Sequence, residues 1–454
     1  MISSTRNTRY FRPLCVCVTD RPSWASSFLF LRRRGTVPLL GLVDTAVIGH
    51  LSHAYYLGGS SVGAMIITVI TWLCGFLRMS TTGLAAQRFG AKDKEGSILV
   101  LLRGLLVAFI IGISVIMLQG IYIPSALYLA GGSEQVQLYA LQYSEIRIWG
   151  VPAALANLVL LGWLLGHHQA KTVMWLLIAT NLINLSLDIL FVVYWDWKVA
   201  GVAYATLIAE YSSLVLGLLV TFFSFKGYWQ QAVEHAQALM QKLASIVAMK
   251  RYLKLNSDIL IRTLCLQVCF VFITFQGARL GDNIVAANAI LMNFLLFISF
   301  GLDGIANAAE VMVGKAYGQA KKLRIRIIIW LSLKWTLAVA VLYTVGFWLF
   351  DDQLINLISD IPEVVSTAQE YVFWLIILPL LACWCYLFDG IYIGLTQAKA
   401  MRNSMMFSTL LCFFPVWFVL QSLGNHGLWV AFSVFMVARG ITLGWHAKAK
   451  LKLY

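Results

Sequence analysis

The sequence predicts an all-α integral membrane protein whose twelve transmembrane helices form two pseudo-symmetric six-helix lobes. Three observations predict this fold. Of the 454 residues, 60% are hydrophobic and only 12% are charged, whereas a soluble chain carries about 25% charged residues. Apolar runs long enough to cross a bilayer recur along nearly the whole chain. Short motifs also repeat at about half the chain length.

The twelve apolar runs and the loops between them define a topology. The predicted helices cover residues 36–51, 62–86, 98–119, 138–165, 172–194, 199–224, 255–276, 284–313, 327–349, 371–395, 403–421 and 426–446. Lys and Arg gather at both termini and in every second loop, near 88–94, 171, 226–254, 315–326 and 399–402, whereas the other loops hold at most one each. Because basic loops remain in the cytoplasm, both termini are expected there.

Four segments follow from this topology: an atypical leader (1–35), an N-terminal lobe (36–224), a cytoplasmic linker (225–251) and a C-terminal lobe (252–454). The leader contains seven Arg. Apolar residues of the linker recur at three- and four-residue steps, which predicts an amphipathic helix on the cytoplasmic membrane surface. Pro38 offers a hinge in the first predicted helix because proline kinks a helix.

An internal repeat supports the division into two lobes. Residues 166–171 (GHHQAK) recur as 394–399 (GLTQAK), and residues 88–92 align with 316–320, both at an offset of 228. Residues 201–205 align with 427–431 at 226. Each half has an even number of spans, so the halves run parallel. Transporters built in this way place substrate between the halves and rock them to alternate access. A duplicated scaffold without transport is the other interpretation.

Polar residues of the N-terminal lobe fall at one depth in the predicted membrane. Asp44, Asp188 and Thr206 each lie six or seven residues from the outer end of a helix, or about 10 Å below that surface. Asn184 precedes Asp188 by four residues and therefore shares its helix face. Intramembrane carboxylates are costly and commonly functional. The set would hold a proton or a small cation; alternatively, its members merely bond across helices.

The C-terminal lobe has a second polar set. Asp303, Asn307 and Glu310 form one stripe on the eighth predicted helix. Arg262 and Asp389 have comparable depths and could pair, either as a structural ion pair or as part of a working site. Arg78 either completes another pair or reaches toward the cytoplasmic interface.

Several other functions are excluded. The net charge of +14 resides in short loops, which is the pattern of topology signals rather than of a nucleic-acid-binding surface. Gly314-Lys315 is followed by Ala316, so no phosphate-binding loop for ATP is present. We find no metal motif and no nucleophile–base pair, so neither an enzyme nor a metal site is expected. His167 and His168 are expected to be solvated in a cytoplasmic turn.

Three segments resemble the DinF-type branch of the MATE (multidrug and toxic compound extrusion) family. They are residues 43–51 (VDTAVIGHL), 76–84 (FLRMSTTGL) and 303–314 (DGIANAAEVMVG). The resemblance covers roughly residues 37–450. It implies a MATE/MOP-type fold and the export of lipophilic, often cationic, compounds in exchange for protons or sodium ions.

The resemblance also implies site residues. Relatives carry a cation site built from an Asp of the first helix, an Asn-x-x-x-Asp pair and a Thr, which match Asp44, Asn184, Asp188 and Thr206. Sodium-coupled members of the NorM type have a Glu on the seventh helix and an Asp on the tenth. Asp389 matches that Asp, but Arg262 occupies the Glu position. The cationic side chain favours protons over sodium as the coupling ion.

These observations together predict a proton-coupled multidrug exporter. It is expected in the bacterial inner membrane as a monomer without a cofactor, in contact with lipid and small lipophilic or cationic substrates and not with nucleic acid. Two alternatives are a sodium-coupled exporter and a flippase for lipid-linked precursors. A flippase would be expected to have a strongly basic central cavity.

Overall fold

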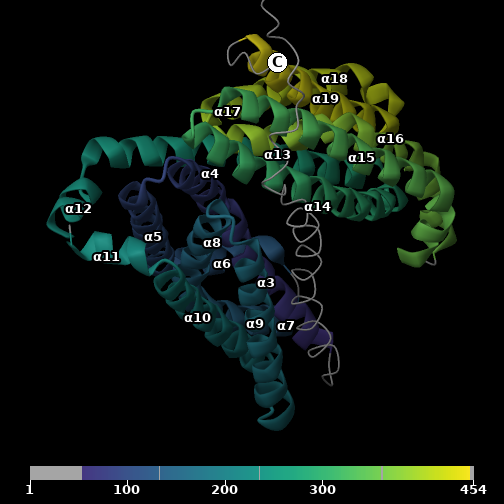
Figure 1. Ribbon diagram of the computed structural model, residues 1–454. Coiled ribbons are helices and arrows are strands. Elements are labelled where there is room, and N and C mark those ends of the chain that lie inside the picture. Colours follow the sequence, from purple (N-terminus) through teal and green to yellow (C-terminus); the bar gives the residue numbers. More distant parts are fainter. Residues whose placement is uncertain (1–53, 132, 235, 359–360, 450–454) are drawn as a thin grey trace, which may run out of the picture.

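The computed structural model describes residues 54–131, 133–234, 236–358 and 361–449 (Figure 1). Within these ranges every regular element is helical, and eleven helical segments are long and apolar enough to cross a membrane. They correspond to the second through twelfth predicted helices. The first predicted helix, residues 36–51, lies outside the described residues.

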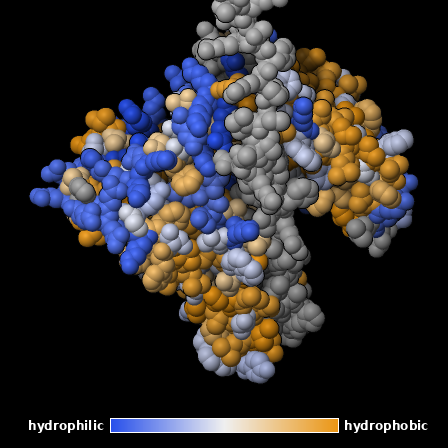
Figure 2. Space-filling view, viewed as in Figure 1, coloured by the Kyte–Doolittle hydropathy of each residue, from blue (hydrophilic) through white to orange (hydrophobic). Residues whose placement is uncertain are grey.

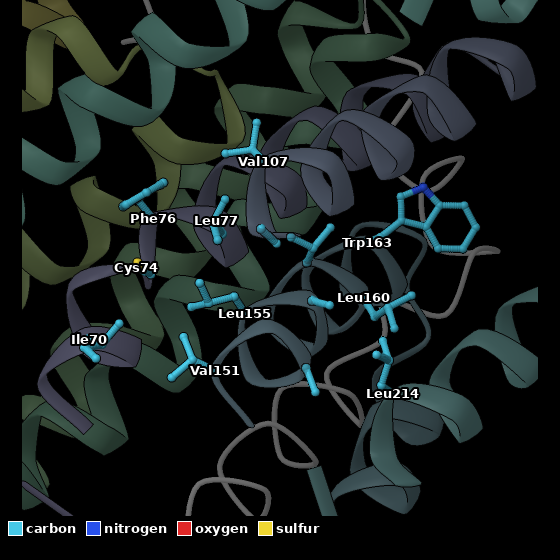
Figure 3. Close-up of a cluster of buried hydrophobic side chains, with 14 of the residues drawn as sticks. Ile70, Cys74, Phe76, Leu77, Val107, Val151, Leu155, Leu160, Trp163 and Leu214 are labelled. Carbon is cyan, nitrogen blue, oxygen red and sulfur yellow. The ribbon is translucent and has the colours of Figure 1, made fainter. Parts of the chain in front are cut away.

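The N-terminal lobe packs around a core of aliphatic and aromatic side chains (Figure 3). Three of its spans are composite: a break at Cys74–Gly75 separates α3 from α4, the turn η2 joins α7 to α8, and the π-helical segment η3 extends α9. The elements are α3 (Ala54–Leu73), α4 (Phe76–Gly90), α5 (Lys94–Met117), α6 (Gln119–Ala130), α7 (Glu134–Arg147), η2 (Ile148–Gly150), α8 (Val151–Gly166), α9 (Ala170–Asp188), η3 (Ile189–Tyr194) and α10 (Lys198–Ser224).

The short helix α6 corrects the sequence prediction, which assigned residues 120–137 to a loop. Its 12 residues include Pro124 and are too few to span about 30 Å of hydrocarbon. Tyr122 fastens α6 to α3 because its hydroxyl donates to the carbonyl of Ile66 at 2.7 Å. The helix is thus held by tertiary contacts.

The C-terminal lobe consists of longer helices than hydropathy predicted. α16 begins at Pro362 rather than at residue 371, because Glu363 and Glu370 end the apolar run without ending the helix. The elements are α13 (Ile246–Leu280), α14 (Asp282–Gly318), α15 (Lys322–Ile358), α16 (Pro362–Gly394), α17 (Ala398–Phe407), η4 (Ser408–Phe413), α18 (Phe414–Leu420), η5 (Gln421–Leu423) and α19 (Asn425–Ala449).

The linker consists of two short helices, α11 (Lys226–Glu234) and α12 (Ala236–Leu243), instead of the single helix expected over 225–251. The end of that range belongs to α13, which begins at Ile246. Leu239 packs against α5, and Lys242 Nζ lies 2.6 Å from Glu95 Oε1 of α5. The linker is therefore docked on the N-terminal lobe. Hydrophilic residues gather over this region, whereas hydrophobic residues cover much of the visible outer side of both lobes (Figure 2).

Backbone conformation supports the internal repeat. Among the described residues, left-handed φ values occur at matching places in the two halves: 58° at Lys92 and 55° at Ala320, then 61° at His168 and 54° at Thr396. Both pairs have the offset of 228 seen in the sequence. Non-glycine residues adopt such φ values infrequently. The two lobes therefore share the same turns after equivalent helices.

The two lobes meet where α4 crosses α14 (Figure 1). A Cβ atom built on Gly90 would lie 2.1 Å from the carbonyl oxygen of Lys315, and one on Gly318 would lie 2.0 Å from that of Gln87. These contacts are reciprocal, since both residue pairs are related by 228. Gln87 Nε2 also donates to the carbonyl of Gly394 at 2.8 Å. Glycines allow such backbone contact between membrane helices.

Candidate functional site

Three of the predicted polar residues meet inside the N-terminal lobe. Asn184 and Asp188 are fully buried on one face of α9, and Thr206 of α10 is 7% exposed. Asn184 Nδ2 donates to Thr206 Oγ1 at 3.2 Å, and Thr206 Oγ1 donates to the carbonyl of Val202 at 2.9 Å. The helix pair α9–α10 thus brings an amide, a hydroxyl and a carboxylate to one buried region. The predicted residues Asp44 and Pro38 lie outside the described residues.

Asp188 occupies a distinctive backbone position. It is the last residue of α9, and the π-helical segment η3 begins at Ile189. A π-helical turn changes the direction in which successive side chains point and is frequent at functional sites. A buried carboxylate is costly when charged. Proton binding would relieve that cost, so the location suits a group that exchanges a proton.

An ion pair close to this region was missed by the sequence analysis. Glu210 follows Thr206 by one turn of α10 and accepts two hydrogen bonds from Arg147 of α7, at 2.7 and 2.8 Å. Gly150 leaves room for the pair, because a Cβ there would lie 2.3 Å from Glu210 Oε2. Glu210 could have been found from the sequence, because it lies four residues after Thr206 and therefore shares its helix face. Two-point pairing of this kind fixes geometry strongly.

The predicted C-terminal set contains a three-residue charge cluster. Arg262 of α13 donates to Asp389 of α16, the pairing that their depths suggested, and Arg439 of α19 donates to the same Asp389 oxygen at 2.7 Å. Arg439, only 2% exposed, was not singled out from sequence. Two guanidinium groups therefore surround one carboxylate. Charge-assisted hydrogen bonds of this kind are among the strongest in proteins, so the cluster ties α13, α16 and α19 together.

The other predicted residues occupy two helices near the lobe interface. Asp303 and Asn307 are half-buried on α14, while Glu310 is 1% exposed one turn further along. Arg78 is half-buried on α4, and its backbone carbonyl accepts a hydrogen bond from Thr82 Oγ1 at 2.8 Å. α4 of the N-terminal lobe and α14 of the C-terminal lobe are the helices that meet at the contact between the lobes. Changes at these positions can therefore affect how the lobes pack.

His167 corrects an expectation of solvent exposure. The ring is 2% exposed, with Nδ1 2.8 Å from the carbonyl of Trp163 and Nε2 2.9 Å from the hydroxyl of Ser97. Because a carbonyl only accepts, Nδ1 carries the proton and Nε2 accepts from Ser97. Burial lowers the pKa of His167 to about 4. Within the described residues, no group of three or more His, Cys, Asp or Glu side chains could hold a metal ion.

Comparisons with known proteins agree across nearly the whole chain. The MatE family model matches residues 35–190 and 259–419. DNA damage-inducible protein F of Escherichia coli strain K12 is 41% identical over 437 residues, which cover 96% of this chain and 94% of that protein. A probable multidrug resistance protein NorM of Acinetobacter baylyi is 25% identical over 400 residues, covering 86% and 87%. A crystal structure of MATE in the bent conformation has a TM-score of 0.81 at 19% identity and covers 95% of both chains.

Proposed function

Because the chain belongs to the MatE family of multidrug and toxic compound extrusion transporters, we propose that it exports small lipophilic or cationic compounds in exchange for protons. Members of this family are membrane transporters and not enzymes, and the described spans fit the twelve-helix fold of the family. The proposed setting is the bacterial inner membrane, where the protein works as a monomer with both termini in the cytoplasm.

The buried Asn184–Asp188–Thr206 group is the observation that carries this proposal. We assign the exchangeable proton to Asp188, which is fully buried one helical turn after Asn184, itself hydrogen-bonded to Thr206. Charge on Asp188 attracts a cationic substrate, and protonation removes that attraction. One proton moving across 100 mV supplies about 2.3 kcal/mol, which corresponds to a concentration ratio of roughly fifty-fold.

The C-terminal charge cluster supports protons over sodium. Asp389 would be the sodium ligand in this lobe, but it is already paired with Arg262 and Arg439. Two fixed positive charges oppose the entry of a cation at this place. The coupling ion is therefore assigned to the N-terminal lobe, and sodium coupling is the second candidate.

The contact between α4 and α14 supports an assignment of conformational state. The Gly90 and Gly318 contacts lie beside two of the loops that are rich in Lys and Arg. If those loops face the cytoplasm, as the charge pattern favours, the lobes are closed on the cytoplasmic side. Transport then requires that this contact opens to admit substrate and closes again before release.

Efflux of a lipophilic cationic dye from proteoliposomes tests the proposal. We expect a pH gradient to drive dye movement by the wild-type protein and a sodium gradient alone to leave it at the protein-free rate. Asp188→Asn should abolish the gradient-dependent component. Asp196→Asn is the matched control, because it makes the same chemical change at an exposed residue in the loop that follows the same span.

Three outcomes would contradict the proposal. Gradient-driven efflux that persists in Asp188→Asn would remove the assignment of the proton to that residue. Dye movement driven by sodium and not by protons would favour sodium coupling. Movement of a lipid-linked precursor, with no movement of the dye under either gradient, would favour the flippase alternative.

A further inference from the structure

An apolar groove runs along the outer side of the C-terminal lobe, away from the contact between the lobes. α16 forms its floor, and α15 and α19 form its walls, with a cavity volume of about 640 Å³. Volumes of this size are typical of ligand pockets. Trp330 of α15, Trp384 of α16 and Trp445 of α19 all line the groove. Trp445 is 72% exposed, so the groove opens outward, where a membrane-spanning protein contacts lipid.

Two glycines shape the α19 wall of this groove. Gly440 is buried and Gly444 is half-buried, and Cβ atoms built on them would approach Trp384 at 3.1 Å and Phe388 at 3.3 Å. The two glycines therefore let α19 pack closely against α16 where the wall of the groove meets its floor. Small residues in membrane helices commonly allow another helix to approach in this way, while Ile441 and Trp445 on the same wall are 64% and 72% exposed.

A single charge lies at one end of the groove. Lys448 is the only charged residue among the described residues that line it. Ile325 near the start of α15, Ile393 at the end of α16 and Ala447 at the end of α19 belong to one buried cluster. The end that holds Lys448 is therefore also the end at which α15 begins with Lys322 and Arg324. This end of the groove therefore lies on the same side of the protein as the loops rich in Lys and Arg.

The length of the groove matches one leaflet of a membrane. The α19 wall extends from Val437 to Lys448, and at 1.5 Å per residue this separation is roughly 16 Å. Half of the hydrocarbon core measures about 15 Å. A lipid acyl chain that starts at the phosphate level beside Lys448 would therefore end near the bilayer centre.

We propose that this groove binds an anionic glycerophospholipid, with an acyl chain between α15 and α19 and the headgroup phosphate at Lys448. The apolar lining accepts the chain, and the ammonium group of Lys448 pairs with the phosphate. Basic positions at the membrane surface between spans favour anionic over zwitterionic headgroups. The site shares no residue with the proposed proton site of the N-terminal lobe and needs no ion gradient.

Tryptophan quenching by lipids brominated in the acyl chain tests this site. The full-length protein is reconstituted with brominated phosphatidylglycerol or brominated phosphatidylcholine, and the contribution of Trp384 is the difference between wild type and Trp384→Phe. We expect phosphatidylglycerol to occupy the groove about fivefold more tightly, the factor that one surface Lys supplies. Trp149 of η2, 53% exposed on the other lobe and with no Lys within one helical turn, is the control, and its contribution should not distinguish the two lipids.

Variants of the groove separate headgroup recognition from chain binding. Lys448→Gln should remove the preference for phosphatidylglycerol, whereas Lys448→Arg should retain it. Gly444→Leu should reduce the quenching of Trp384 by both lipids, because its side chain fills the groove. Equal quenching of Trp384 by both lipids in the wild-type protein, or a preference that survives Lys448→Gln, would overturn the proposal.

Discussion

Adding a methyl group at the crossing of α4 and α14 should open the contact between the two lobes. A Cβ at Gly318 would lie 2.0 Å from the carbonyl oxygen of Gln87, and one at Gly90 would lie 2.1 Å from that of Lys315. Ordinary contact begins near 3.4 Å, so the helices must separate by about 1.3 to 1.4 Å. Both obstacles are backbone atoms, which cannot rotate away as a flexible side chain would.

The expected magnitude follows from the cost of overpacking, which is about 1–3 kcal/mol for a methyl group. A cost of about 2 kcal/mol at this contact would change the ratio of closed to open molecules about 30-fold. Because the clash lies between lobes, the protein can relieve it by moving the lobes instead of unfolding. The effect should therefore appear as a change of conformation with little loss of thermal stability.

Distances between spin labels measure this change. Labels at Lys92→Cys and Lys321→Cys, in the exposed loops after α4 and α14, report the separation of the lobes in a cysteine-depleted background. Gly90→Ala and Gly318→Ala should each shift the distance distribution toward longer values. Gly346→Ala is the control, since a Cβ there meets nothing within 4 Å. An unchanged distribution in both interface variants would refute the reasoning.

Two further predictions concern stability. Burial lowers the pKa of His167 from 6.5 to about 4. Between these two pH values the unfolded chain therefore binds a proton at His167 and the folded protein does not. Stability should fall as pH drops from 6.5 toward 4, by at most about 3 kcal/mol at 1.36 kcal/mol per pH unit. Thermal unfolding should show a smaller loss in His167→Gln; equal losses would contradict the assignment. Gly150→Ala should force apart the Arg147–Glu210 pair and cost about 3 kcal/mol, measured by denaturant unfolding against Gly346→Ala, and equal stability of the two variants would exclude a role for the pair.

Much of the fold could be predicted because a membrane imposes simple rules on a sequence. The family and the all-helical membrane fold are confirmed. Hydropathy located the apolar middle of each span but not its ends: Glu363 and Glu370 lie within α16, where polar residues continue a helix beyond the hydrocarbon. α6 was missed because Pro124 and a short apolar run resemble a loop. Element ends depend on tertiary contacts that hydropathy does not contain.

The candidate site was predictable where its residues share a helix and less so where they do not. Asn184 and Asp188 are four residues apart, so helical periodicity placed them on one face. Arg439 lies alone in its span, and nothing local links it to Asp389, fifty residues earlier in the chain. A count of charges within each predicted span would have found Arg439, but only the packing of α16 against α19 identifies its partner. The roles of the N-terminal site residues stay a prediction.

The docked linker limits how the lobes can move. α12 is held on α5 by Lys242 and Leu239, ends at Leu243, and is followed by only two residues before α13 begins at Ile246. Three steps of 3.8 Å between Cα atoms reach about 11 Å at most. While α12 stays docked, the first residue of α13 must therefore remain within about 11 Å of the end of α12, which is fixed on the N-terminal lobe. The C-terminal lobe can therefore turn about this point but cannot separate from the N-terminal lobe there, which would make the basic end the pivot of any rocking motion between the lobes.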